Sequence, residues 1–173
     1  MFLLLKTENH FLEARTLEEW ISADENKIPA WCHLDNDAEN EEKYGKLYNY
    51  FALVDERGLA PDGYSIPGKK YWFTIFKFIG GNEVVCKMLK SEIYWDTSGD
   101  NSVGFSAFPS GFSYYYGSFG TGLGKSCNFW SADSKEDPYA IGFSLNEERA
   151  YIDILDISKR FRKGTGRLIN KKK

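Results

Sequence analysis

The pattern of apolar and polar positions predicts short helices in the first half of the chain. Thr16 and Glu19 have the spacing of a capping box, in which a hydroxyl and a carboxylate together cap the first turn of a helix. Leu17, Trp20 and Ile21 then fall on one helical face. These residues predict a first short helix that begins after Thr16.

A second helix is predicted over residues 69–79. Its apolar side chains at helical spacing are Trp72, Phe73, Phe76 and Ile79. The pair Gly80-Gly81 follows, and glycine commonly ends a helix because it adopts the left-handed conformation without strain. Residues 83–89 fit a third short helix. The stretch 44–53 fits helix and strand templates equally well.

The pattern changes after residue 91. Between Gly104 and Trp130 the chain has nine aromatic residues and six glycines in 27 positions, a mixture typical of short strands joined by turns. Residues 139–145 and 150–157 then form a predicted hairpin. The expected fold is α+β: two to three short helices in the first half, then a twisted antiparallel sheet with long loops.

Length and charge limit the alternatives. A chain of 173 residues is one ordinary domain, which we place at residues 1–160. Residues 161–173 form a basic tail, since residues 158–173 hold eight Lys or Arg and no Asp or Glu. That tail fits a solvated terminus or a weak contact with an anionic polymer or membrane. The net charge of −3 argues against a nucleic-acid partner.

The residues that usually carry catalysis or bind metals are few. His10 and His33 are the only histidines, and Cys32, Cys86 and Cys127 have no zinc-type spacing. We expect three buried thiols, the alternative being a disulfide between two of them in an oxidising compartment. No catalytic residue, metal or cofactor is predicted.

Two motifs resemble ligand sites. Asp35, Asn36, Asp37 and Glu39 could offer oxygens to Ca²⁺, although a solvated loop with an Asx-turn fits them better than an EF-hand does. The run 117–126 ends in Gly-Lys-Ser, but its glycine spacing is wrong for a phosphate-binding loop. Neither motif predicts a cofactor.

No segment approaches the roughly 20 apolar residues that span a bilayer, so no transmembrane segment is expected. The apolar start, residues 1–5, is too short for an export signal. A chain that is complete as it stands would therefore be cytoplasmic.

Many blocks of the chain resemble, in order, the Fibrobacter succinogenes major paralogous domain over about residues 15–160. The matching blocks are Pro29–Cys32, Asp35–Asp37, Lys43–Tyr50, Arg57–Pro67, Ile79–Gly81, Lys87–Lys90, Gly104–Phe112, Gly117–Phe119 and Phe129–Ala132. The chain departs from the family at both ends. Near the C-terminal end, Gly164–Ile169 replaces a closing strand that usually carries a cysteine. Because the terminal strands pair in such a fold, the pairing is shortened here or the chain is a fragment.

The resemblance implies a C-type-lectin-like fold, shared with formylglycine-generating enzymes, in a protein of the bacterial surface that is often a lipoprotein. It therefore implies an extracellular location and a noncatalytic binding or adhesion module. The alternatives are a cysteine-dependent enzyme of the formylglycine-generating type and a degenerate structural relative. We expect a glycan or protein ligand, and exposed rings are the usual means of holding one. The predicted ligand-binding residues are Tyr114, Tyr115, Tyr116, Trp130 and Asp133.

Overall fold

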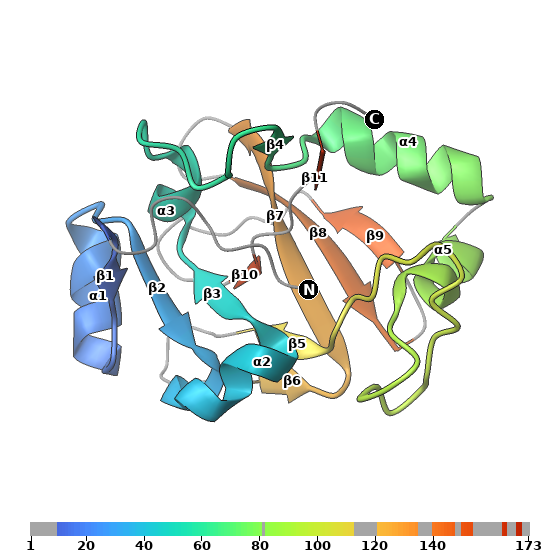
Figure 1. Cartoon of the computed structure of the whole chain (residues 1–173), viewed down its shortest axis with the longest axis horizontal. Coiled ribbons are helices and arrows are strands. Elements are labelled where there is room, and N and C mark those ends of the chain that lie inside the picture. Colours follow the sequence, from blue (N-terminus) through green and yellow to red (C-terminus); the bar gives the residue numbers. More distant parts are fainter. Residues whose placement is uncertain are drawn as a thin grey trace.

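The computed structural model describes residues 10–80, 82–112, 121–134, 140–147, 150–153, 164–165 and 169–170. The helices are α1 (Leu17–Glu25), α2 (Glu41–Tyr44), α3 (Tyr50–Val54), α4 (Lys69–Ile79) and α5 (Asn82–Leu89), with 3-10 turns η2 (Leu34–Asn36) and η3 (Ala38–Asn40). The strands are β1 (Leu12–Glu13), β2 (Ala30–His33), β3 (Lys46–Tyr48), β4 (Tyr64–Ser65), β5 (Ser110–Phe112), β6 (Thr121–Leu123), β7 (Ser126–Ser134), β8 (Ala140–Asn146), β9 (Ala150–Asp153), β10 (Gly164–Thr165) and β11 (Ile169–Asn170). The predicted single α+β domain is confirmed (Figure 1).

The main sheet is mixed, so the expectation of an antiparallel sheet confined to the second half was wrong. Its strands run in the order β1-β2-β3-β10-β7-β5-β6, and β8 and β9 branch from β7. β1 is parallel to β2, and both β5 and β10 are parallel to β7. The reason is that β10 joins strands from both halves: it pairs antiparallel with β3 and parallel with β7. The predicted hairpin is confirmed where β8 and β9 pair antiparallel.

Strand pairing continues beyond residue 160, the expected end of the domain. In addition to β10, the short strand β11 pairs antiparallel with β4, with Ile169 opposite Ser65. The end of the predicted domain therefore does not coincide with the end of the pairing.

Local capping signals determine one end of each of two helices. The Thr16 hydroxyl accepts a hydrogen bond from the Glu19 amide, and the Glu19 carboxylate accepts one from the Thr16 amide, which confirms the capping box. Gly80 ends α4 in the left-handed conformation with φ of +105°, and its amide donates to the carbonyl of Phe76. Both helices form where the sequence predicts them. The five α-helices of the described residues exceed the expected two to three because α2 and α3 are single turns.

The ambiguous stretch 44–53 divides into β3 and α3 at Asn49, which is fully buried. Its Oδ1 accepts from the amides of Ala30 and Ala52, both at 3.0 Å. Its Nδ2 donates to Asp24 Oδ1 at 3.0 Å and to the carbonyl of Ile28 at 2.8 Å. One side chain therefore caps α3 and holds it against α1 and β2.

Two apolar clusters flank the main sheet. One joins α4 and α5 to the strands β7, β8 and β9, and the other joins α1 to β2 and β3. In the first cluster Trp72 is fully buried and stacks on Phe143, with ring centroids 4.4 Å apart and 11° between the planes. Phe73, predicted to share this face, is instead 53% exposed because it lies at the flank of the helix.

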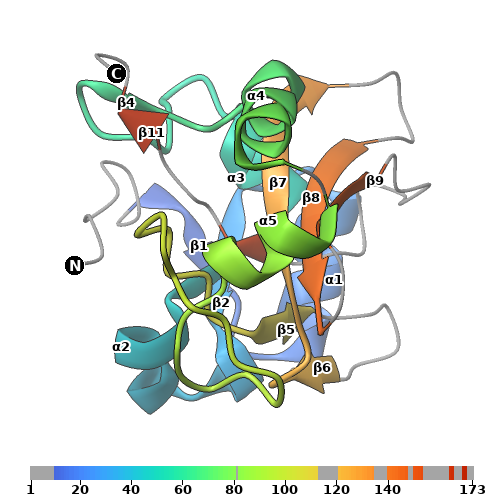
Figure 2. The ribbon, with the colours of Figure 1, turned by 90° about the vertical axis from the view of Figure 1, so that its right-hand side faces the viewer.

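The two views place the helices at different ends of the sheet. α4 lies at the top, with α5 below it on the same side, while α2 lies at the bottom (Figure 1, Figure 2). Within the described ranges no helix has the length and apolar character needed to cross a bilayer.

The buried stack predicts that two aromatic residues of α4 contribute very differently to the free energy of unfolding. Trp72→Ala should lower the free energy of unfolding by about 3–5 kcal/mol, because it opens a cavity in the core. Phe78→Ala should change it by less than about 0.5 kcal/mol, since Phe78 is 88% exposed. Urea unfolding followed by circular dichroism measures both, and equal losses in the two variants would contradict this packing.

Candidate functional site

Of the five predicted ligand-binding residues, Tyr114, Tyr115 and Tyr116 lie outside the described residues. Trp130 is in the core, with 3% of its surface exposed. Its indole Nε1 donates to the carbonyl of Tyr48 at 2.9 Å, and its ring meets the edge of the Tyr50 ring at a centroid distance of 5.9 Å. The indole of Trp130 is therefore not available as a surface platform in this conformation.

Asp133, on the same strand β7, is exposed, but its carboxylate is engaged. It accepts hydrogen bonds from the backbone amide of Lys69 and from the Ser131 hydroxyl. Gly68 at the N-cap of α4 has no side chain to do this, and a Cβ there would lie 3.0 Å from Asp133 Oδ2. Asp133 thus caps α4 from a distant strand, where a carboxylate also suits the positive end of the helix dipole. Its role in ligand binding stays a prediction.

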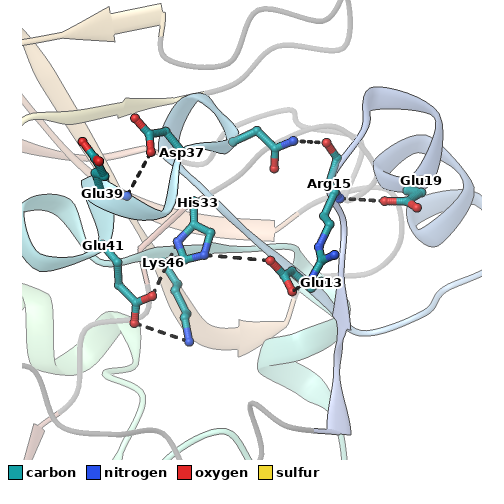
Figure 3. A network of polar contacts seen from close by, with 9 residues as sticks. Glu13, Arg15, Glu19, His33, Asp37, Glu39, Glu41 and Lys46 are labelled. Carbon is teal, nitrogen blue, oxygen red and sulfur yellow. Dashed lines mark hydrogen bonds and ion pairs between the residues drawn. The ribbon is translucent and has the colours of Figure 1, made fainter.

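A second group of polar side chains surrounds His33 at the end of β2 (Figure 3). Neighbouring residues of a strand point to opposite faces, and Cys32 packs with α1 while His33 faces the other side. Lys46 lies directly opposite His33 in the register of β3 with β2. Glu13 arrives on β1, and Glu41 begins α2.

The imidazole of His33 lies between the two carboxylates. Nε2 is 3.9 Å from Glu13 Oε1, and Nδ1 is 3.6 Å from Glu41 Oε2. Lys46 Nζ is 3.5 Å from Glu41 Oε1 and 4.2 Å from the centre of the Trp31 ring. Only 9% of the His33 side chain is exposed, so this is a partly enclosed, charge-balanced cluster.

The electrostatics of the cluster act most clearly on Glu13. A hydrogen bond from Arg15, 2.8 Å long, holds the pKa of the Glu13 carboxyl below its usual value. The positive charge of Arg15 and the charges of His33 and Lys46 act in the same direction, and partial burial opposes them. Glu13 therefore stays ionised to lower pH than an isolated glutamate.

This arrangement leaves the two imidazole nitrogens 3.9 and 3.6 Å from the carboxylates of Glu13 and Glu41, too far for a hydrogen bond. It does not converge on a metal, because the two carboxylates flank opposite ring nitrogens, and the described residues contain no group of three His, Cys, Asp or Glu side chains that could hold one. The neighbouring thiol, Cys32, lies on the other face of β2. The chemistry that the cluster best supports is electrostatic: it ties β1, β2, β3 and α2 together.

No local motif in the sequence indicates this cluster. Glu13, His33, Glu41 and Lys46 meet only because β1 pairs parallel with β2, and no local motif encodes that pairing. Alternation along β2 shows that Trp31 and His33 share one face and that Ala30 and Cys32 share the other. It does not identify the residues of other strands that contact them.

The expected burial of all three thiols is confirmed. Cys86 donates to the carbonyl of Asn146 at 3.2 Å, and burial raises the pKa of its thiol, an effect that the charge of Lys90 only partly offsets. A thiol in this environment is a poor nucleophile, since the reactive form is the thiolate.

The loop at residues 35–37 is exposed and closes with an Asx-turn, as the sequence suggested. Asp37 Oδ1 accepts from the Glu39 amide at 2.9 Å, and Asp35 and Asn36 adopt positive φ values of 51° and 58°. His10 is exposed, as its polar surroundings indicate. Asp35, Asp37 and Glu39 precede α2, which itself begins with Glu41 and Glu42.

Comparison with known proteins gives one match. A family model described as the Fibrobacter succinogenes major domain matches residues 7–169, which is nearly the whole chain. No curated protein and no solved structure matches it.

The Glu13 interactions predict a specific dependence of stability on pH. Because the folded-state pKa of Glu13 is lowered, its contribution is fully present above the ordinary glutamate pKa of about 4.3 and is lost as pH falls through the folded value. Glu13→Gln should cost up to about 1 kcal/mol at pH 7 and progressively less below about pH 4.

Urea unfolding of Glu13→Gln and the wild-type chain at several pH values between 3 and 7 tests this expectation. Glu92→Gln, which changes an exposed loop carboxylate outside the cluster, is the control. A Glu13→Gln cost that stays constant with pH would show that the carboxylate charge has no part in the stabilisation.

Proposed function

We propose that this chain, which belongs to the Fibrobacter succinogenes major domain family, is a noncatalytic binding module of the bacterial cell surface. Its ligand is a glycan or a protein, held on a rigid α+β scaffold and not chemically changed. Family membership over residues 7–169 supports the surface-module part of the proposal, because the resemblance described above implies that location and role.

The observation that carries the noncatalytic assignment is the enclosure of the reactive groups. All three thiols are buried, and the pKa of Cys86 is raised, which disfavours the thiolate that a cysteine-dependent enzyme requires. The side chain of His33 is 9% exposed and lies between two carboxylates, and the thiol next to it in the sequence, Cys32, packs on the other face of β2. Several large aromatic side chains, by contrast, remain at the surface, among them Tyr94 with 46% exposure. Exposed rings with enclosed reactive groups favour recognition over catalysis.

The proposed ligand face is the segment that holds Tyr114, Tyr115 and Tyr116. In the sequence these residues fall between β5 and β6, whose ends Phe112 and Thr121 are paired antiparallel. Connections between paired strands commonly carry binding residues, because the strands on either side fix their ends. Since Trp130 is enclosed and Asp133 caps α4, the three tyrosines are the principal ring-bearing members of the proposed face.

We further propose that the fold is a variant of the C-type-lectin-like fold. The support is topological: late strands of the chain return to early ones, because β10 pairs with β3 and β11 pairs with β4. In a lectin-like fold the two terminal strands pair with each other, whereas here β1 pairs with β2 and the late strands reach β3 and β4, which is the variation that we propose.

A glycan array probed with the full chain, followed by titration calorimetry on each hit, tests the binding proposal. Tyr115→Ala should weaken binding about tenfold, because an aromatic contact contributes on the order of 1.4 kcal/mol. Tyr94→Ala is the matched control, since it removes an exposed tyrosine from a different part of the surface and should change affinity less than about twofold.

Trp130→Ala adds a second control. It should lose stability through its core packing, so its thermal midpoint is measured before its binding is interpreted. The proposal fails if neither the array nor a parallel screen of surface proteins gives a ligand, or if Tyr115→Ala and Tyr94→Ala bind equally well.

A further inference from the structure

Helix α4 has an unusual composition for a surface helix. Its eleven residues include three lysines and no Asp or Glu. One side packs into the core through Trp72, Ile75, Phe76 and Ile79. The other side is left uncovered and still carries aromatic residues: Phe78 is 88% exposed, Phe73 is 53% exposed and Tyr71 is 38% exposed. Exposed rings in one place commonly mark a contact with a partner or a membrane.

The exposed face has a definite order. Lys70 and Lys77 are seven residues apart, so they lie within about 20° of each other around the helix and form one row. Phe73 lies on one side of this row, and Phe78 lies on the other. Lys69 also approaches this face, with Nζ 5.4 Å from the centre of the Phe73 ring. Cationic heads between two phenyl rings therefore face outward together.

The lysines and phenyl rings on the exposed face of α4 suit some binding partners poorly. The lysines of this face can only donate hydrogen bonds, and α4 has no carboxylate or amide side chain to accept from the hydroxyl groups of a sugar. A second copy of the chain, docked symmetrically, would place lysines against lysines. An anionic bilayer requires only what is present: apolar rings for the acyl boundary and ammonium groups for the lipid phosphates.

The charge distribution of the molecule also favours an orientation in which α4 faces an anionic surface. The acidic residues that precede and begin α2 lie at the opposite end of the molecule from α4 in both views (Figure 1, Figure 2). They are Asp35, Asp37, Glu39, Glu41 and Glu42. With α4 on an anionic surface, these carboxylates lie at the far end of the molecule, and the carboxylate that meets the start of α4, that of Asp133, is already hydrogen-bonded to the Lys69 amide and the Ser131 hydroxyl.

We propose that the outer face of α4 docks on a membrane surface rich in anionic lipid. Phe73 and Phe78 enter the boundary between headgroups and acyl chains, and Lys70 and Lys77 contact lipid phosphates. The cap that Asp133 provides fixes the start of this helix on β7, so the face is presented by the core of the domain. This docking is separate from the ligand face proposed above and does not depend on it.

Sedimentation of the full chain with vesicles tests the proposal. Vesicles of phosphatidylcholine with 30% phosphatidylglycerol should bind the wild-type chain, and pure phosphatidylcholine vesicles should not. Lys70→Gln with Lys77→Gln should lower the partition coefficient about 25-fold, since each lysine near an anionic surface contributes about fivefold. Phe73→Ser with Phe78→Ser should lower it at least tenfold.

The controls separate docking from folding. Ile93→Ser with Val103→Ser removes two exposed apolar side chains from another part of the surface and should leave partitioning unchanged. Circular dichroism should give all variants the wild-type spectrum, because every changed side chain is largely exposed.

Three results would overturn the proposal. The first is no binding to the anionic vesicles at low salt. The second is binding that the α4 variants leave unchanged. The third is that the chain does not bind vesicles but does self-associate, or binds RNA or an acidic polysaccharide, and that the α4 variants lose this interaction. That result would assign the face to another partner.

Discussion

The middle of strand β7 is buried on both of its faces, and the rest of the structure depends on this. Cys127 and Phe129 enter the cluster beneath α4 and α5, whereas Trp130 packs against Tyr50 of α3 on the other side. β7 also pairs with β8, β5 and β10, and it ends in the carboxylate of Asp133 that caps α4. β7 therefore links the cluster beneath α4 and α5 to α3 and, through the hydrogen bond from Trp130 to the carbonyl of Tyr48, to β3, and it sets the position of α4.

The sequence predicted those features that local chemistry determines. Thr16 and Glu19 lie within one turn and cap α1 by themselves, and Gly80 ends α4 through its own backbone freedom. The division of residues 44–53 was not predictable, because Asn49 starts α3 only with partners on α1 and β2. The parallel pairs of the sheet depend on registers between distant segments, which periodicity does not encode.

The predicted site shows the same limit. Trp130 looked like a platform because of its neighbours in the sequence, but β7 is covered on both faces, so alternation could not bring its ring to the surface. Phe73 shows the reverse case: its spacing suited the core, yet it lies at the flank of α4, outside the contact that Trp72 makes. The cluster around His33 forms only through tertiary pairing, and no motif in the sequence marks it.

In the described part of the chain the three thiols and His33 are enclosed, while rings and charges are divided over the surface. The acidic end at α2 and the basic, aromatic face of α4 are held apart by the same sheet (Figure 1). Because β7 packs beneath α4 and α5 and also contacts α3 and β3, neither side should lose its structure alone, and the geometry of the surface should persist as long as the domain is folded.

Native-state hydrogen exchange in increasing urea measures most directly whether the strands on the two sides of β7 unfold together. The account predicts that the amides of β7 and those of β2 and β3 exchange only through global unfolding, with one common free energy and one urea dependence. If the β2–β3 amides open in a separate step at lower free energy while β7 stays protected, the two parts of the core are independent, and the central role given to β7 is wrong.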